Sequence, residues 1–252
     1  MPRTLLLSFA HPDDESFLAG GSACRYAAAG FRVVLASATR GESGKAGDPP
    51  LCPPGELADL RERELREAAA ILGIAEVHFL GYRDRELAAA PPDAIRQQLV
   101  ALIRRERPPV VLTFDPNGAN LHPDHVAISR FTIDAVAAAG DPRWFPGARP
   151  PHIVPRLLWV PGRHPWEWAR EANPGGRPGV DFAIDVSGWR DRKLAALQAH
   201  RTQDASVRRH FLDRADRDRV LSVEFFRQAG GPTLPTRPLA DLFEGIGREA
   251  LE

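Results

Sequence analysis

Several patterns are missing from this sequence, and each absence excludes a class of protein. The 252 residues contain no run of 18 apolar residues, so we expect no bilayer-spanning segment. The first apolar run, Thr4–Leu7, leads almost directly to His11, so we expect no signal peptide. The only two cysteines, Cys24 and Cys52, do not form a CxxC pair. They indicate reduced thiols in a cytoplasmic protein and not a disulfide framework.

The chain also lacks an excess of charge of either sign. It has 33 Lys and Arg residues against 33 Asp and Glu residues. This balance argues against nucleic acid or an anionic membrane as the main partner and leaves a small molecule as the expected one. No GxGxxG phosphate loop follows the first apolar run, which disfavours a nucleotide-binding module. The sequence leaves homo-oligomerisation open, since its Arg- and Trp-rich C-terminal third offers surface for an interface.

Residues 1–140 alternate short apolar runs with helical patterns. The apolar runs predict strands at Thr4–Phe9, Arg32–Ala38, Glu76–Leu80 and Val110–Phe114. The spacing of apolar residues predicts helices at Ser16–Ala29, Glu56–Leu72, Pro92–Glu106 and Asp124–Ala139. Strands alternating with helices predict an α/β fold: a Rossmann-like, doubly wound, mainly parallel sheet with helices on both faces.

The pattern changes at residue 141. Residues 141–179 hold nine of the 24 prolines, and all five tryptophans lie between Trp144 and Trp189. Strands at Arg156–Val160 and Phe182–Val186 and a helix at Asp191–His200 are still expected. We predict one domain, residues 1–252, in which residues 141–252 form a loop-rich C-terminal subdomain that completes the sheet and the site.

The tryptophans of this irregular segment have two interpretations. Trp144, Trp159, Trp166 and Trp168 would form a wall over a crevice and stack on a sugar, or they would anchor the loops.

Two segments rich in acid and histidine each follow a predicted strand. "HPDDE", beginning at His11, follows the first strand, and "HPDH", beginning at His122, follows the fourth. In the common strand order 3-2-1-4-5, strands 1 and 4 are neighbours, and their carboxyl ends face one ligand-binding crevice. We therefore expect these two segments, 111 residues apart in the chain, to meet in space.

The residue types of these segments suit a catalytic divalent metal. His11, Asp14 and His125 would supply two imidazoles and a carboxylate and leave one position open for water. Zinc fits this set, as do iron(II) and cobalt. Asp13 would then stand beside the bound water as a general base, and His122 would stabilise an oxyanion.

Helix capping is the structural alternative for the acids. Asp13 and Asp14 would cap the helix that begins near Ser16, and Asp124 would cap the later helix. Capping explains an acid at each place but not three histidines in two HPD segments.

Arg61 is predicted to point inward. It lies four residues from both Leu57 and Leu65, on the apolar face of the Glu56–Leu72 helix. A buried guanidinium needs either an anionic partner in the core or a polar cavity, and the sequence leaves both open.

Among the other polar residues, His200 and Gln203 suggest only a helix end held by hydrogen bonds. His152, His164 and His210 are expected to be solvated.

Longer motifs give the chain a family resemblance. "AHPDDE" and "HPDH", together with "TRGESG", "LRERELREAAAILG", "GYRDREL" and "IDVSGWRDRKLAALQAHRTQ", resemble the LmbE/PIG-L family of zinc-dependent N-acetylglucosaminyl deacetylases. That family includes deacetylases of mycothiol and bacillithiol synthesis.

The resemblance implies a role for each site residue. His11, Asp14 and His125 would hold the metal, Asp13 would be the base and His122 the electrostatic partner of the intermediate. Arg61 and Asp84 would contact the sugar or its attached group. Asn120 stands where some members have a tyrosine, and its amide can donate a hydrogen bond but no proton.

The expected function is removal of an acetyl group from an N-acetylglucosamine-containing conjugate by metal-activated water. One alternative is a zinc-dependent amidase that acts on a larger thiol-conjugated amide. The other is a non-catalytic sugar-binding member of the family, which the intact Asp13 disfavours.

Overall fold

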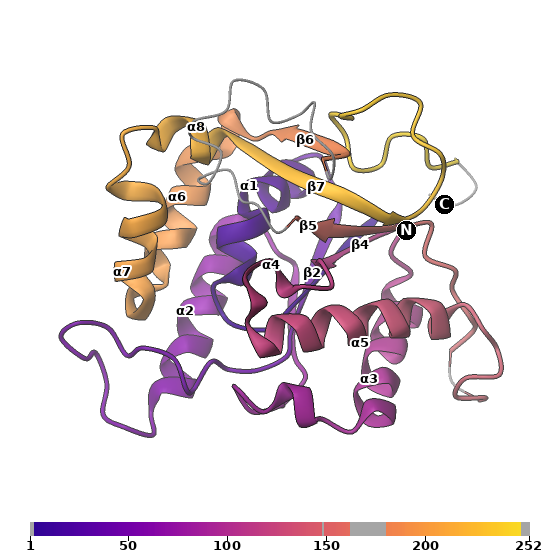
Figure 1. Ribbon diagram of the computed structural model, residues 1–252, viewed down its shortest axis with the longest axis horizontal. Coiled ribbons are helices and arrows are strands. Elements are labelled where there is room, and N and C mark those ends of the chain that lie inside the picture. Colours follow the sequence, from indigo (N-terminus) through magenta and orange to yellow (C-terminus); the bar gives the residue numbers. More distant parts are fainter. Residues whose placement is uncertain (1–2, 148, 162–179, 248–252) are drawn as a thin grey trace.

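The computed structural model describes residues 3–147, 149–161 and 180–247 (Figure 1). The strands are β1 Thr4–Phe9, β2 Arg32–Ser37, β3 Glu76–Phe79, β4 Val110–Phe114, β5 Arg156–Val160, β6 Phe182–Asp185 and β7 Val223–Gly230. The α-helices are α1 Asp14–Ala28, α2 Leu57–Leu72, α3 Pro92–Glu106, α4 Gly118–Leu121, α5 Pro123–Ala139, α6 Arg190–Ala199, α7 Asp204–Val207 and α8 Arg217–Ser222. Short 3₁₀ turns are η1 Leu87–Ala89, η4 Ser187–Trp189 and η5 Arg201–Gln203, and η6 Arg208–Leu212 is a π-helix.

The strands form one mixed sheet in the order β3-β2-β1-β4-β5-β7-β6. Strands β1 to β5 pair in parallel, in the predicted order, while β7 is antiparallel to both β5 and β6. The predicted doubly wound α/β fold is therefore confirmed. Strand β7 was not predicted, because it follows a strongly charged stretch and itself contains charged residues.

Helices cover both faces of the sheet (Figure 1). Helices α3 and α5 pack together on one face, and α1, α2 and α6 pack together on the other. The central strands are buried along their whole length, as strands covered on two faces must be. No helix of the described residues combines the length and the apolar character that crossing a bilayer requires.

The order of the sheet places two loops side by side. β1 and β4 are hydrogen-bonded neighbours, with Leu5 opposite Val110 and Leu7 opposite Leu112. The residues that follow Phe9 and Phe114 consequently leave the same edge of the sheet, and the site lies there.

Candidate metal centre and active site

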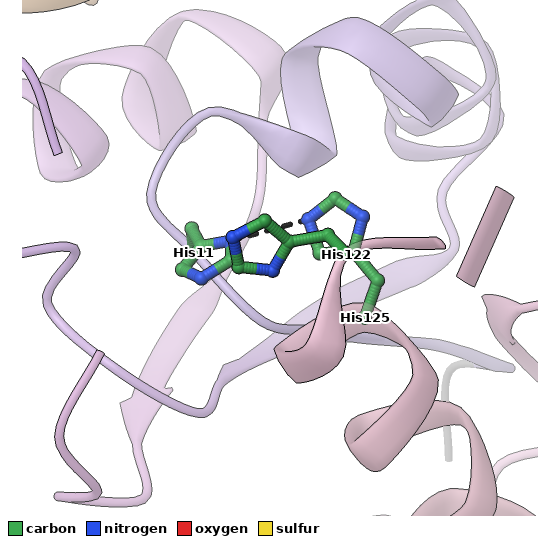
Figure 2. A group of neighbouring side chains, drawn as sticks. All are labelled: His11, His122 and His125. Carbon is green, nitrogen blue, oxygen red and sulfur yellow. Dashed lines mark hydrogen bonds between the residues drawn. The ribbon is translucent and has the colours of Figure 1, made fainter. Parts of the chain in front are cut away.

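The two HPD segments meet at the carboxyl ends of β1 and β4. His11 stands in the turn between β1 and α1, while His122 and His125 stand at the start of α5. Figure 2 shows the three rings gathered together. Their centroids are 4.9 to 5.1 Å apart. One ring nitrogen from each of these histidines lies within 4.8 Å of the others.

The three predicted metal ligands converge. The distance from His11 Nδ1 to His125 Nε2 is 3.2 Å. The carboxylate of Asp14 lies 3.7 Å from His11 Nδ1 through Oδ2 and 3.4 Å from His125 Nε2 through Oδ1. Ligand atoms placed tetrahedrally around zinc at its usual bond lengths are about 3.3 Å apart. The donor set and its spacing thus fit a small divalent ion.

The surroundings of His125 leave its Nε2 free of a proton. Its Nδ1 lies 3.2 Å from the carbonyl oxygen of Gly118, an arrangement in which Nδ1 carries the hydrogen and donates it. Its ring stacks on Phe114 with centroids 4.0 Å apart. Burial and the neighbouring His11 lower the pKa of His125 to about 3, so the ring is neutral and Nε2 offers a lone pair.

Two carboxylates orient His11 through Nε2, the ring nitrogen that does not face His125. Its Nε2 lies 3.1 Å from Asp84 Oδ1 and 3.3 Å from Asp124 Oδ2, which leaves Nδ1 facing His125. Burial opposes a charge on this ring, but the hydrogen bonds to Asp124 and Asp84 and the charge of Asp14 raise its pKa to about 10. A carboxylate that accepts from the outer nitrogen of a ligating histidine is the usual support of such a ligand.

The capping explanation of the acids is wrong. Asp13 makes no side-chain cap bond to α1, and Asp14 Oδ2 accepts from the backbone N–H of His11 at 2.8 Å. Fully buried Asp124 accepts from His11 and from the backbone N–H groups of Arg85 and Leu87. The sequence interpretation missed this role of Asp124, because its acid stands where a helix cap is also expected.

His122 is the actual cap of α5 and has a defined tautomer. Its Nδ1 accepts from the backbone N–H of Asp124 at 3.2 Å, so the proton is on Nε2. Burial and the charge on His11 lower the pKa of His122, which keeps the ring neutral. A neutral imidazole with Nε2–H at the cavity wall is a hydrogen-bond donor.

Asp13 and Arg61 form an ion pair at the edge of the centre. Arg61 is 3% exposed, and its Nη2 lies 2.9 Å from Asp13 Oδ2. The guanidinium also donates to the carbonyl oxygens of Pro12 and Gly41. A Cβ on Gly41 would lie 2.1 Å from Arg61 Nη1, so only glycine leaves room for this side chain. Both interpretations of Arg61 from the sequence therefore apply. The guanidinium has an anionic partner, Asp13, and that partner lines the polar cavity.

The backbone of Asp13 is strained. Its φ is 126°, a region that non-glycine residues rarely enter and that costs on the order of 1–3 kcal/mol. Burial raises the pKa of its carboxyl group, while the guanidinium of Arg61 opposes that shift. A carboxyl group whose pKa is raised by burial and lowered by a nearby guanidinium is suited to both taking up and releasing a proton.

A cavity of about 380 Å³ opens over this centre, within the size range of small-molecule sites. All eight residues proposed from the sequence line it: His11, Asp13, Asp14, Arg61, Asp84, Asn120, His122 and His125. Asn120 uses its Oδ1 to accept the backbone N–H of His122 at 3.0 Å. Asp84 contacts His11 and accepts the backbone N–H of Ser43, so its carboxylate supports the centre as well as facing the cavity.

Further lining of the cavity comes from residues to which sequence interpretation gave no role in the site. Phe17 and Leu18 of α1 and Gln203, Ser206 and His210 of the C-terminal helices line it. His210, which was expected to be solvated, is half-buried and borders this cavity. No sequence signal pointed to Ser206 and His210, since they lie in a stretch without apolar periodicity, and Gln203 was interpreted only as part of a helix end.

Two further expectations are corrected or fall outside the structure. His152 is buried, with Nε2 3.0 Å from the carbonyl oxygen of Pro108, and is not solvated. Trp144 and Trp159 do not line the cavity; Trp144 packs against Arg96 instead. Trp166, Trp168 and His164 lie outside the described residues.

Comparison with known proteins points to one family. Residues 6–136 match the family model PIG-L, described as GlcNAc-PI de-N-acetylase. A 1D-myo-inositol 2-acetamido-2-deoxy-alpha-D-glucopyranoside deacetylase from Thermobifida fusca is 35% identical over 91% of this chain and 94% of its own length.

Solved structures share the fold. The conserved protein TT1542 from Thermus thermophilus has a TM-score of 0.70 and 31% identity, covering 91% of this chain and 96% of that one. N,N'-diacetylchitobiose deacetylase from Pyrococcus horikoshii also has a TM-score of 0.70, over 90% of this chain and 83% of that one. At 23% identity the second likeness concerns the fold alone.

Proposed function

The chain belongs to the PIG-L family, and from that membership we propose a metal-dependent hydrolase that removes the acetyl group of an N-acetylglucosamine conjugate. The observation that carries the proposal is the convergence of His11 Nδ1, His125 Nε2 and the Asp14 carboxylate at the base of a cavity. Two imidazoles and one carboxylate leave an open coordination position, which distinguishes a catalytic site from a closed structural one.

Zinc is the ion that we propose for this site, held by His11, Asp14 and His125. When bound, it would lower the pKa of a coordinated water to about 7 and polarise the acetyl carbonyl.

Asp13 is the proposed proton carrier. Its carboxylate takes the proton from the attacking water and returns it to the amide nitrogen as the C–N bond breaks, which yields acetate and a free amine. Arg61 holds this carboxylate through Oδ2, so the other oxygen, Oδ1, is the one we assign to the proton.

His122 is the proposed donor to the developing oxyanion. The hydrogen bond from Asp124 N–H to its Nδ1 places the ring proton on Nε2. A preorganised donor of this kind contributes about 3 kcal/mol to the transition state. Asn120 and Asp84 are proposed to bind sugar hydroxyls, because both line the cavity beside this group.

The group attached to the sugar is proposed to be an inositol. The Thermobifida fusca relative, named a 1D-myo-inositol 2-acetamido-2-deoxy-alpha-D-glucopyranoside deacetylase, supports this choice over the malate-type group of bacillithiol synthesis. Neutral hydroxyl groups also suit the Ser206, Gln203 and His210 side chains that line the cavity.

The test is acetate release from N-acetylglucosaminyl-inositol and N-acetylglucosaminyl-malate, with protein stripped of metal and then reloaded with zinc. We expect zinc-dependent release that favours the inositol conjugate. Asp13→Asn should lose at least ~10²-fold in kcat, because an amide cannot accept the proton, and should still bind zinc. Zinc-loaded protein that releases acetate from neither conjugate would contradict the proposal and favour an amidase for larger amides.

A further inference from the structure

The third acid of the HPDDE segment and a histidine near the end of α6 form a buried pair that deacetylation chemistry does not use. His200 Nε2 lies 2.8 Å from Glu15 Oε1, and both side chains are fully buried. Neither residue lines the cavity. They are 185 residues apart in the chain, so the fold brings this pair together at the cost of desolvating both groups.

The other oxygen of Glu15 acts on the proposed base. Glu15 Oε2 accepts the backbone N–H of Asp13 at 3.1 Å, and Asp13 is the residue whose φ is 126°. Because the Asp13 carboxylate is carried by a strained turn, its direction depends on the bonds that hold the turn. Arg61 holds the turn from the cavity side and Glu15 from the core side.

We propose that Glu15 and His200 are positioning residues for Asp13. His200 fixes the Glu15 carboxylate through Oε1, and Glu15 fixes the strained backbone of Asp13 through Oε2. The inference rests on the proposed function, because it assigns Asp13 as the base. It also gives a role to His200, a histidine of the C-terminal part that does not line the cavity.

A second buried carboxylate provides a matched control. Glu224 is 1% exposed, accepts the backbone N–H groups of Gly21 and Ser22 in the same helix α1, and lies 2.7 Å from Lys193. Its partners do not line the cavity. Loss of Glu224 therefore also removes a buried ion pair and hydrogen bonds to the backbone of α1, but no bond to Asp13.

The experiment compares zinc-loaded Glu15→Met, Glu15→Gln and Glu224→Met for kcat, KM and zinc content. Methionine keeps the length of the side chain but removes the acceptor of the Asp13 N–H, whereas glutamine keeps one acceptor oxygen. We expect Glu15→Met to lose about 10²-fold in kcat, with KM and zinc content within about twofold of wild type. Glu15→Gln should recover most of that loss, and Glu224→Met should keep the wild-type kcat.

A folded, zinc-loaded Glu15→Met with wild-type kcat would overturn the proposal, as would an equal loss in Glu224→Met. If Glu15→Met does not fold, His200→Leu replaces it; we expect about a tenfold loss in kcat, and an unchanged kcat would overturn the proposal.

A readout independent of turnover separates this proposal from the proposed function. Crystal structures of Glu15→Gln and His200→Leu report the φ of Asp13, which we expect to stay near its native value in the first and to move in the second. If wild type releases no acetate, the proposed function fails, and these angles still decide whether the pair positions Asp13.

Discussion

At the residue scale, the three histidines of the centre are chemically different because their outer neighbours differ. His125 donates to a backbone carbonyl, His122 accepts a backbone N–H, and His11 faces two carboxylates. Each contact determines which ring nitrogen faces the cavity and whether that nitrogen carries a proton. We propose that His125 Nε2 and, once a metal ion displaces its proton, His11 Nδ1 serve as ligands, and that His122 Nε2–H serves as donor.

Asp124 should matter for metal affinity although it is not a proposed ligand. Asp124→Asn replaces the carboxylate that orients His11 with a neutral amide, so we expect the Kd for zinc to rise about 10–100-fold. Titration with a competing chelator measures this. Asp134→Asn, on the same helix and paired with Arg96, is the control, and equal Kd values for both variants would contradict the prediction.

Arg61 should not be replaceable by lysine. Its guanidinium donates to Asp13, Pro12 and Gly41 at once, and a lysine ammonium on a flexible stem cannot reproduce that fork. We expect Arg61→Lys to lower kcat/KM about 10²-fold, because the Asp13 carboxylate loses its fixed direction. Steady-state kinetics tests this against Arg66→Lys, an exposed position of α2. Wild-type kinetics for Arg61→Lys would show that positive charge alone suffices.

At the scale of elements, the strands that are short apolar runs could be predicted from the sequence, and the elements rich in charged residues could not. Strands β1, β4 and β5 have the predicted bounds because each is a short apolar run. The convergence of His11 and His125 then followed from strand order alone. Strand β7 and the short helices from Asp204 to Ser222 could not be predicted, because charged residues dominate there and the burial that forms these elements is tertiary. The place of Ser206 and His210 at the cavity was missed for the same reason.

These unpredicted helices should determine which group on the sugar is accepted. Gln203, Ser206 and His210 are spaced at three and four residues, and all three line the cavity. We expect His210→Ala to raise KM for N-acetylglucosaminyl-inositol about tenfold, as loss of one hydrogen bond would, and to leave the kinetics of N-acetylglucosamine unchanged. Arg209→Ala, at an exposed neighbouring position, is the control. An equal change in KM for both substrates would place His210 at the sugar and not at its attached group.

At the scale of the molecule, the C-terminal part is joined to the core through the sheet and through buried charge. β5 continues the parallel sheet from β4, and β7 and β6 extend it further. Two buried carboxylates connect α1 to the later elements: Glu15 of α1 pairs with His200, and Glu224 of β7 pairs with Lys193 of α6 and accepts backbone N–H groups of α1. Such connections within one core favour cooperative unfolding, so we propose that residues 1–252 form a single domain.

This proposal predicts coincident unfolding transitions in metal-free protein. All five tryptophans lie between residues 144 and 189, so their fluorescence reports the C-terminal part, whereas far-UV circular dichroism reports all helices. We expect one denaturant midpoint from both probes. Glu224→Met leaves Lys193 buried without its partner and should lower the free energy of unfolding by about 3–5 kcal/mol, shifting both midpoints together. A fluorescence transition that precedes the circular dichroism transition would show that residues 141–252 unfold separately, and the chain would then comprise two domains with the site between them.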